Sequence, residues 1–78
     1  MGPEQVRKAH HAQPFRPFII HMGNGRQVRV DHPKFMAVSP TGRYALVWLA
    51  EDRWEEIELF LVTSLEFPSK SNGSRKKK

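Results

Sequence analysis

The sequence contains no cysteine, which excludes disulfide bonds and thiolate metal sites. It also lacks any apolar run near the ~18–20 residues that a membrane-spanning helix needs. Its first residues do not follow the basic and then apolar order of a signal peptide. We therefore expect a cytoplasmic protein that does not associate with membranes.

The chain is also short. Its 78 residues form one domain at most. A chain of this size buries only about 60% of the surface that its unfolded form exposes, which is near the lower limit for folding without cross-links. The hydrophobic core must therefore be small.

The net charge of +5 is unevenly distributed along the chain. Residues 1–50 hold seven basic and two acidic side chains, whereas residues 51–68 hold one basic and six acidic ones. Residues 1–68 are therefore neutral as a whole, and the five basic side chains of residues 69–78 supply the excess. The basic character belongs to a tail rather than to a binding face of the folded part.

The sequence divides into three segments. Residues 1–13 are predicted to be a helical lead-in, because Pro3 suits the first turn of a helix and Glu4 complements its dipole. Pro14 and Pro17 end that helix and favour extended chain. Residues 14–68 are expected to form the folded domain. Residues 69–78 contain no apolar residue, and we predict a disordered basic tail.

The segment from Phe18 to Asp31 is predicted to be a β-hairpin around Asn24 and Gly25. A two-residue turn would mix apolar and charged side chains on both faces. A three-residue loop with Gly25 in the left-handed region instead pairs residue 20 with residue 28 and residue 18 with residue 30. This register makes one face apolar, so we choose it.

Further strands are expected at residues 35–38, 44–49, 54–60 and 63–67. Residues 39–43 fit a type I turn followed by a left-handed glycine, and residues 61–62 fit a single helical turn. Residues 44–49 are apolar on both faces, which predicts a strand covered on both sides. Phe18, Phe35 and Trp48 are expected in the core.

Five or six short antiparallel strands are too few for two well-covered sheets. A sheet that curls on itself buries its apolar face and leaves few open edges. We therefore expect a mainly β fold, a small antiparallel barrel with a short N-terminal helix. A split two-sheet sandwich is the alternative.

Short sequence blocks resemble a group of small bacterial proteins of uncharacterised function. They are RPF at residues 16–18, NGR at 24–26, HP at 32–33, SPTGR at 39–43 and LVTSLE at 61–66. The resemblance covers nearly all of residues 14–67 and implies no activity.

The order of elements is similar to that of Sm-like proteins, which have an SH3-like barrel. Members of that family assemble into rings and contact RNA, so the resemblance implies self-association and RNA binding. Residues 31–35 hold an acid and an aromatic but lack the asparagine of the RNA-binding loop. Residues 61–64 hold neither the arginine nor the glycine of the second motif. Only the fold is carried over.

No set of residues predicts catalysis or a cofactor. The histidines at positions 10, 11, 21 and 32 lack metal-ligand spacing, and no nucleophile stands with a base. Surface or half-buried histidines are the simpler interpretation. We expect neither an enzyme nor a small-molecule substrate.

Since no residues predict catalysis, we expect the function to be binding. We expect a protein partner or self-association, and nucleic-acid binding is the alternative. One subunit's acidic strand could pair head to tail with another's basic hairpin. The candidate acidic face consists of Glu51, Asp52, Glu55, Glu56 and Glu58. The candidate contacts for nucleic acid or a partner are Arg16, Arg26, Arg29, Lys34, Arg43, Tyr44, Arg75, Lys76, Lys77 and Lys78.

Overall fold

Six strands, one α-helix and two 3-10 turns make up residues 3–68, the part of the chain that the computed structural model describes. The predicted disorder of residues 69–78, and with it the candidate contacts of the tail, lie outside the described residues. In chain order the elements are α1 (Pro3–His10), β1 (Phe18–Met22), β2 (Gln27–Val30), η1 (Pro33–Phe35), β3 (Met36–Val38), β4 (Tyr44–Ala50), β5 (Arg53–Glu58), η2 (Leu59–Leu61) and β6 (Val62–Glu66).

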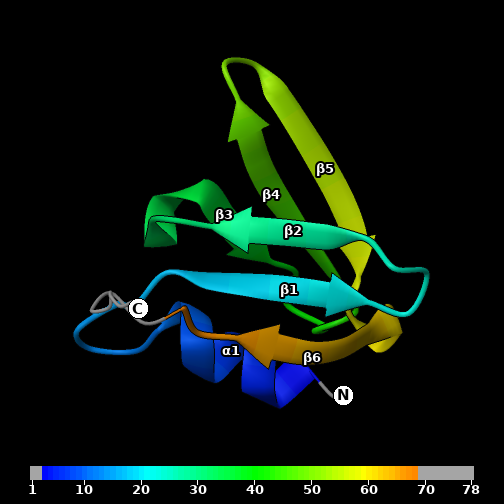
Figure 1. Ribbon diagram of the computed structural model, residues 1–78, viewed down its shortest axis with the longest axis horizontal. Coiled ribbons are helices and arrows are strands. Elements are labelled where there is room, and N and C mark those ends of the chain that lie inside the picture. The colour runs from blue at the N-terminus through cyan, green and yellow to red at the C-terminus, as the bar shows by residue number, and fades with distance from the viewer. Residues whose placement is uncertain (1–2, 69–78) are drawn as a thin grey trace, which may run out of the picture.

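The strands form two antiparallel sheets, with the orders β2-β1-β6 and β3-β4-β5. Within residues 3–68 no strand pair joins the sheets, so the closed barrel that we favoured is absent there. The two-sheet alternative describes the molecule better. The reason lies in the 3-10 turn η1, which interrupts the chain between β2 and β3 at Pro33, a residue that cannot donate to a strand ladder. Figure 1 shows the β4–β5 hairpin rising away from β1, β2 and β6.

The first hairpin has the predicted register. Phe18 lies opposite Val30 and Ile20 opposite Val28. Gly25 has a φ of 89°, and its amide donates to the carbonyl of Met22 at 3.0 Å. The side chains of β1 alternate between buried and half-buried positions, as expected for a strand with one face on the core.

The second predicted turn is also confirmed, and it contacts the helix. Gly42 has a φ of 78°, and its amide donates to the carbonyl of Ser39 at 2.9 Å. A Cβ at Gly42 would lie 3.3 Å from the Cβ of Pro3. The guanidinium of Arg7 donates to the carbonyl of Ser39 at 3.4 Å. The turn and the first helical turns are therefore closely packed.

The helix contributes to the same core as the strands. Val6 and Ala9 are buried on one side of α1, and they pack with Phe18, Ile20 and Leu59. Figure 1 shows α1 lying against the sheet beside β1 and β6. Full burial of a side chain such as Phe18 or Ile20 stabilises the fold by about 1.5–3 kcal/mol. The predicted lead-in is thus a structural part of the fold.

Two predictions about burial are wrong. Phe35 was expected in the core, but it is 42% exposed, because it ends the 3-10 turn η1 and the strand begins only at Met36. Trp48 was also expected in the core and is only half-buried. The segment 44–49 was expected to be covered on both sides, yet Leu46 is also 42% exposed. The β2-β1-β6 sheet covers one face of β4 and leaves the other face open.

The end of the fifth strand also differs from the prediction. β5 stops at Glu58, and Leu59 to Leu61 form the 3-10 turn η2. The helical turn that we placed at residues 61–62 therefore begins two residues earlier. Leu59 is fully buried in it, so core packing draws this residue inward and bends the chain.

Candidate functional site

The open face of the β3-β4-β5 sheet is the candidate site, and we call it the Trp face. It is the face turned away from the buried residues Ala45, Val47 and Ile57. Strand pairing places its members opposite one another in three cross-strand pairs, Tyr44 with Glu58, Leu46 with Glu56 and Trp48 with Trp54.

The two tryptophans contact each other across the strands. The centroids of their rings are 4.7 Å apart, and the planes are tilted by 58°. Trp54 is 54% exposed, which is high for so large an apolar side chain. Aromatic pairs of this geometry stabilise a hairpin by about 0.5–1.5 kcal/mol beyond the area they bury. The pair therefore presents aromatic surface to solvent, mainly through Trp54.

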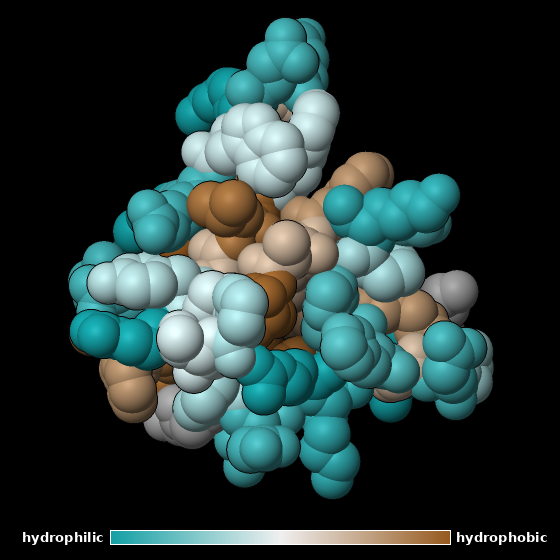
Figure 2. All heavy atoms as spheres, turned by 180° about the vertical axis from the view of Figure 1, so that it is seen from behind, coloured by the Kyte–Doolittle hydropathy of each residue, from teal (hydrophilic) through white to brown (hydrophobic). Residues whose placement is uncertain are grey.

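A shallow hollow lies beside the tryptophan pair on the same sheet. Its volume is about 300 Å³, which is at the lower end of the range for ligand-binding pockets. Figure 2 shows the molecule from behind, where pale and brown side chains run from the projecting hairpin into the middle, between teal hydrophilic ones. The hollow is lined by Ala37, Val38, Ser39, Tyr44, Ala45, Leu46 and Glu56.

The predicted acidic face is divided by the structure. Glu56 and Glu58 lie on the Trp face, next to its apolar side chains. Glu51 and Asp52 form the turn at the end of the β4–β5 hairpin, and both are exposed. Glu55 points to the opposite face of β5 and is only 15% exposed. The five residues therefore do not form one surface.

Glu55 is engaged within the molecule. Its carboxylate is paired with the guanidinium of Arg26, the residue that precedes β2. The acidic strand and the basic hairpin thus meet in one and the same chain. This pair takes both residues out of the head-to-tail pairing that the charge distribution suggested.

The other early cations are dispersed. Arg29 pairs with Asp31 at 2.6 Å, and the guanidinium of Arg43 lies 5.6 Å from the centroid of the Tyr44 ring. Lys34 lies exposed in η1, and the guanidinium of Arg16 lies over the ring of Phe67. The predicted basic residues do not converge on one face.

The histidines have structural contacts. Nε2 of His10 lies 2.8 Å from the carbonyl oxygen of Pro33, and Nε2 of His21 lies 2.9 Å from Glu66. Nδ1 of His32 accepts from the amide of Lys34 at 3.3 Å, which caps η1. Within residues 3–68 no three histidine, aspartate or glutamate side chains are grouped so that they could hold a metal ion.

Sequence reasoning missed Trp54 and Leu46 as surface residues. The signal for Trp54 was present, because it stands in step with Glu56 and Glu58 and out of step with the buried Ile57. For Leu46 the sequence offers no such signal, since apolar residues occupy both faces of β4. Only the position of the other sheet shows which face is covered.

Comparison with models of protein families, with curated proteins and with solved structures found no match. The resemblance of the short sequence blocks therefore stays a prediction. Across residues 3–68 no helix is long and apolar enough to cross a membrane.

Proposed function

We propose that the protein is a non-catalytic binding module, and that its Trp face binds a protein segment rich in apolar and basic side chains. The observation that carries this proposal is the cross-strand contact of the half-buried Trp48 with the exposed Trp54, beside the exposed Leu46. Exposed aromatic clusters of this kind are enriched at the energetic centres of protein interfaces.

The charge of the face determines the chemistry of the partner. Glu56 and Glu58 flank the apolar side chains and attract a basic segment. The same carboxylates repel the phosphates of a nucleic acid, even though tryptophans are good stacking platforms. Since Arg26 and Arg29 are each paired with a carboxylate, the observed contacts favour a protein partner over RNA or DNA.

The finer description of the fold is part of the proposal. We propose that the domain is an opened form of the SH3-like small barrel. The order of its elements supports this: a hairpin, a three-stranded meander and a 3-10 turn, followed by a last strand that returns to β1. In such a domain the face of the β3-β4-β5 sheet that the other sheet leaves uncovered is available for binding.

The experiment uses the tryptophans as reporters, because the chain contains only these two and both lie on the proposed face. The full chain is titrated with a synthetic peptide of alternating leucine and lysine while tryptophan emission is recorded. A peptide of alternating leucine and glutamate and a single-stranded RNA are titrated in parallel. We expect tryptophan emission to change in a saturable way with the leucine-lysine peptide and to stay constant with the other two ligands.

Matched variants locate the contact. Trp54→Ala should weaken peptide binding by about tenfold or more, which is typical of a hot-spot aromatic. Phe60→Ala is the control, since Phe60 is similarly exposed at 63% but lies in η2. Equal affinities of the two variants would contradict the proposal, as would a stronger response to RNA or to the acidic peptide.

A further inference from the structure

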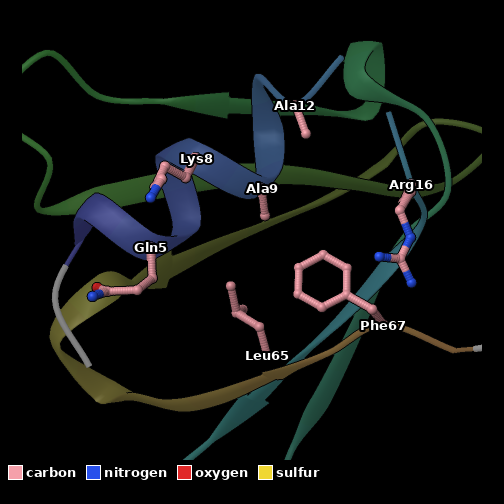
Figure 3. Close-up of a pocket in the computed structure, with 7 residues that line it drawn as sticks. All are labelled: Gln5, Lys8, Ala9, Ala12, Arg16, Leu65 and Phe67. Carbon is pink, nitrogen blue, oxygen red and sulfur yellow. The ribbon is translucent and has the colours of Figure 1, made fainter. Parts of the chain in front are cut away.

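A second hollow lies between α1 and the end of β6 with the residue that follows it, and we call it the helix groove. Its volume is about 440 Å³. Figure 3 shows Leu65 and Phe67 opposite Ala9, with Arg16 at one end and Gln5 and Lys8 at the other. The described residues that line it are Gln5, Lys8, Ala9, Ala12, Arg16, Leu65 and Phe67.

The walls of the helix groove are apolar and its ends are basic. The guanidinium of Arg16 lies 5.2 Å from the centroid of the Phe67 ring, which holds its charge at the rim. Phe67 in turn packs against the buried Phe18, with ring centroids 5.9 Å apart. None of the described lining residues is acidic. A complementary occupant must therefore combine apolar surface with negative charge.

The same chain carries such a surface at the end of the β4–β5 hairpin, residues 49–52, which we call the hairpin tip. Glu51 and Asp52 are exposed there, and within residues 3–68 neither carboxylate has an ion-pair partner. Leu49 lies two residues before Glu51 and is 41% exposed. Arg53 follows and offsets one of the two negative charges.

We infer that the hairpin tip of one copy of this protein binds in the helix groove of another copy. Leu49 then packs against the apolar wall near Phe67, and the two carboxylates meet Lys8 and Arg16. Figure 1 shows the tip and α1 at opposite ends of the fold, so a chain does not fill its own groove. The contact is head to tail, and it builds rings or open chains of copies.

This contact replaces the pairing that the sequence suggested. The acidic surface is the hairpin tip rather than the whole of β5, and the basic surface is the helix groove rather than the first hairpin. Because the surfaces are small and partly electrostatic, the association is weak and falls with added salt. It uses residues outside the Trp face and so does not rest on the proposed function.

Sedimentation velocity of the full chain tests the inference. We expect the mean sedimentation coefficient to rise with protein concentration at low salt and to return to the monomer value at high salt. A concentration-independent monomer at low salt would overturn the inference.

Charge reversal identifies the two surfaces. One variant carries Lys8→Glu and Arg16→Glu, and the other carries Glu51→Lys and Asp52→Lys. Each alone should lose association by about tenfold or more, since like charges then meet at the contact. Mixing the two variants should restore association, because acidic grooves then meet basic tips and basic grooves meet acidic tips.

Three controls complete the design. Lys34→Glu reverses a cation outside the groove, and Leu46→Ala alters only the Trp face, so both should associate as the parent chain does. Arg53→Gln removes the opposing charge at the tip and should strengthen association at least about twofold. This variant keeps the test decisive if a charge reversal prevents folding.

Two results would contradict the contact. One is a groove variant that associates like the parent chain, and the other is a mixture of folded variants that stays monomeric. A loss of association in Leu46→Ala would assign self-association to the Trp face instead.

Discussion

The guanidinium of Arg26 is paired with the carboxylate of Glu55, and this pair joins the start of β2 to the middle of β5. The two sheets share no strand pair within residues 3–68, so this pair is one of the side-chain contacts that hold them together there. Arg26 is half exposed, whereas Glu55 is only 15% exposed. The arginine therefore supplies the charged partner of a largely buried carboxylate.

Arg26→Ala should destabilise the fold by about 1–2 kcal/mol, because it leaves the carboxylate of Glu55 without its partner. Urea denaturation measures the change. Arg29→Ala is the control: its pair with Asp31 is more than half exposed on both sides, so the loss should stay below about 0.5 kcal/mol. Equal losses in the two variants would show that the buried pair has no special role.

The two glycines with positive φ allow a second comparison. Gly25→Ala should cost about 1–2 kcal/mol through backbone strain alone, since no atom lies within 4 Å of the new Cβ. Gly42→Ala should cost more, because its Cβ also meets Pro3 and pushes against α1. Thermal unfolding ranks the two variants. The reverse order would mean that the helix does not pack on this turn.

Neighbouring residues of β4 test which face is covered. Val47→Ala should destabilise by about 2 kcal/mol, because Val47 is fully buried and its truncation leaves a cavity. Leu46→Ala should cost less than about 1 kcal/mol, because Leu46 is already 42% exposed. Chemical denaturation measures the free energy of unfolding of both variants. A loss in Leu46→Ala as large as that in Val47→Ala would restore our first view of a strand buried on both faces.

The turn between β4 and β5 contains a residue under backbone strain. Glu51 has a φ of 50°, a conformation that asparagine adopts more readily than glutamate. Glu51→Asn should therefore stabilise the fold by about 0.5–1 kcal/mol, or about 3–6 °C in Tm. Asp52→Asn, at a position without positive φ, should leave Tm nearly unchanged. Calorimetry of both variants makes the comparison, and equal shifts would point to charge rather than strain.

The sequence by itself determined the local structure of this protein. The Gly-Asn-Gly loop and the alternation around it predicted the first hairpin residue by residue, with Phe18 opposite Val30. The glycines at positions 25 and 42 were predicted to be left-handed, and both have positive φ. Turn chemistry and strand alternation act over a few residues, so a single sequence contains all the information they need.

The tertiary structure alone decided which surfaces are exposed and which charges meet. Nothing near Leu46 in the sequence indicates that its face of β4 is open, because burial depends on where the β2-β1-β6 sheet lies. Arg26 and Glu55 are 29 residues apart, and the helix groove combines α1 with the end of β6. Such contacts depend on how distant elements pack, which the spacing of residues along one chain does not encode.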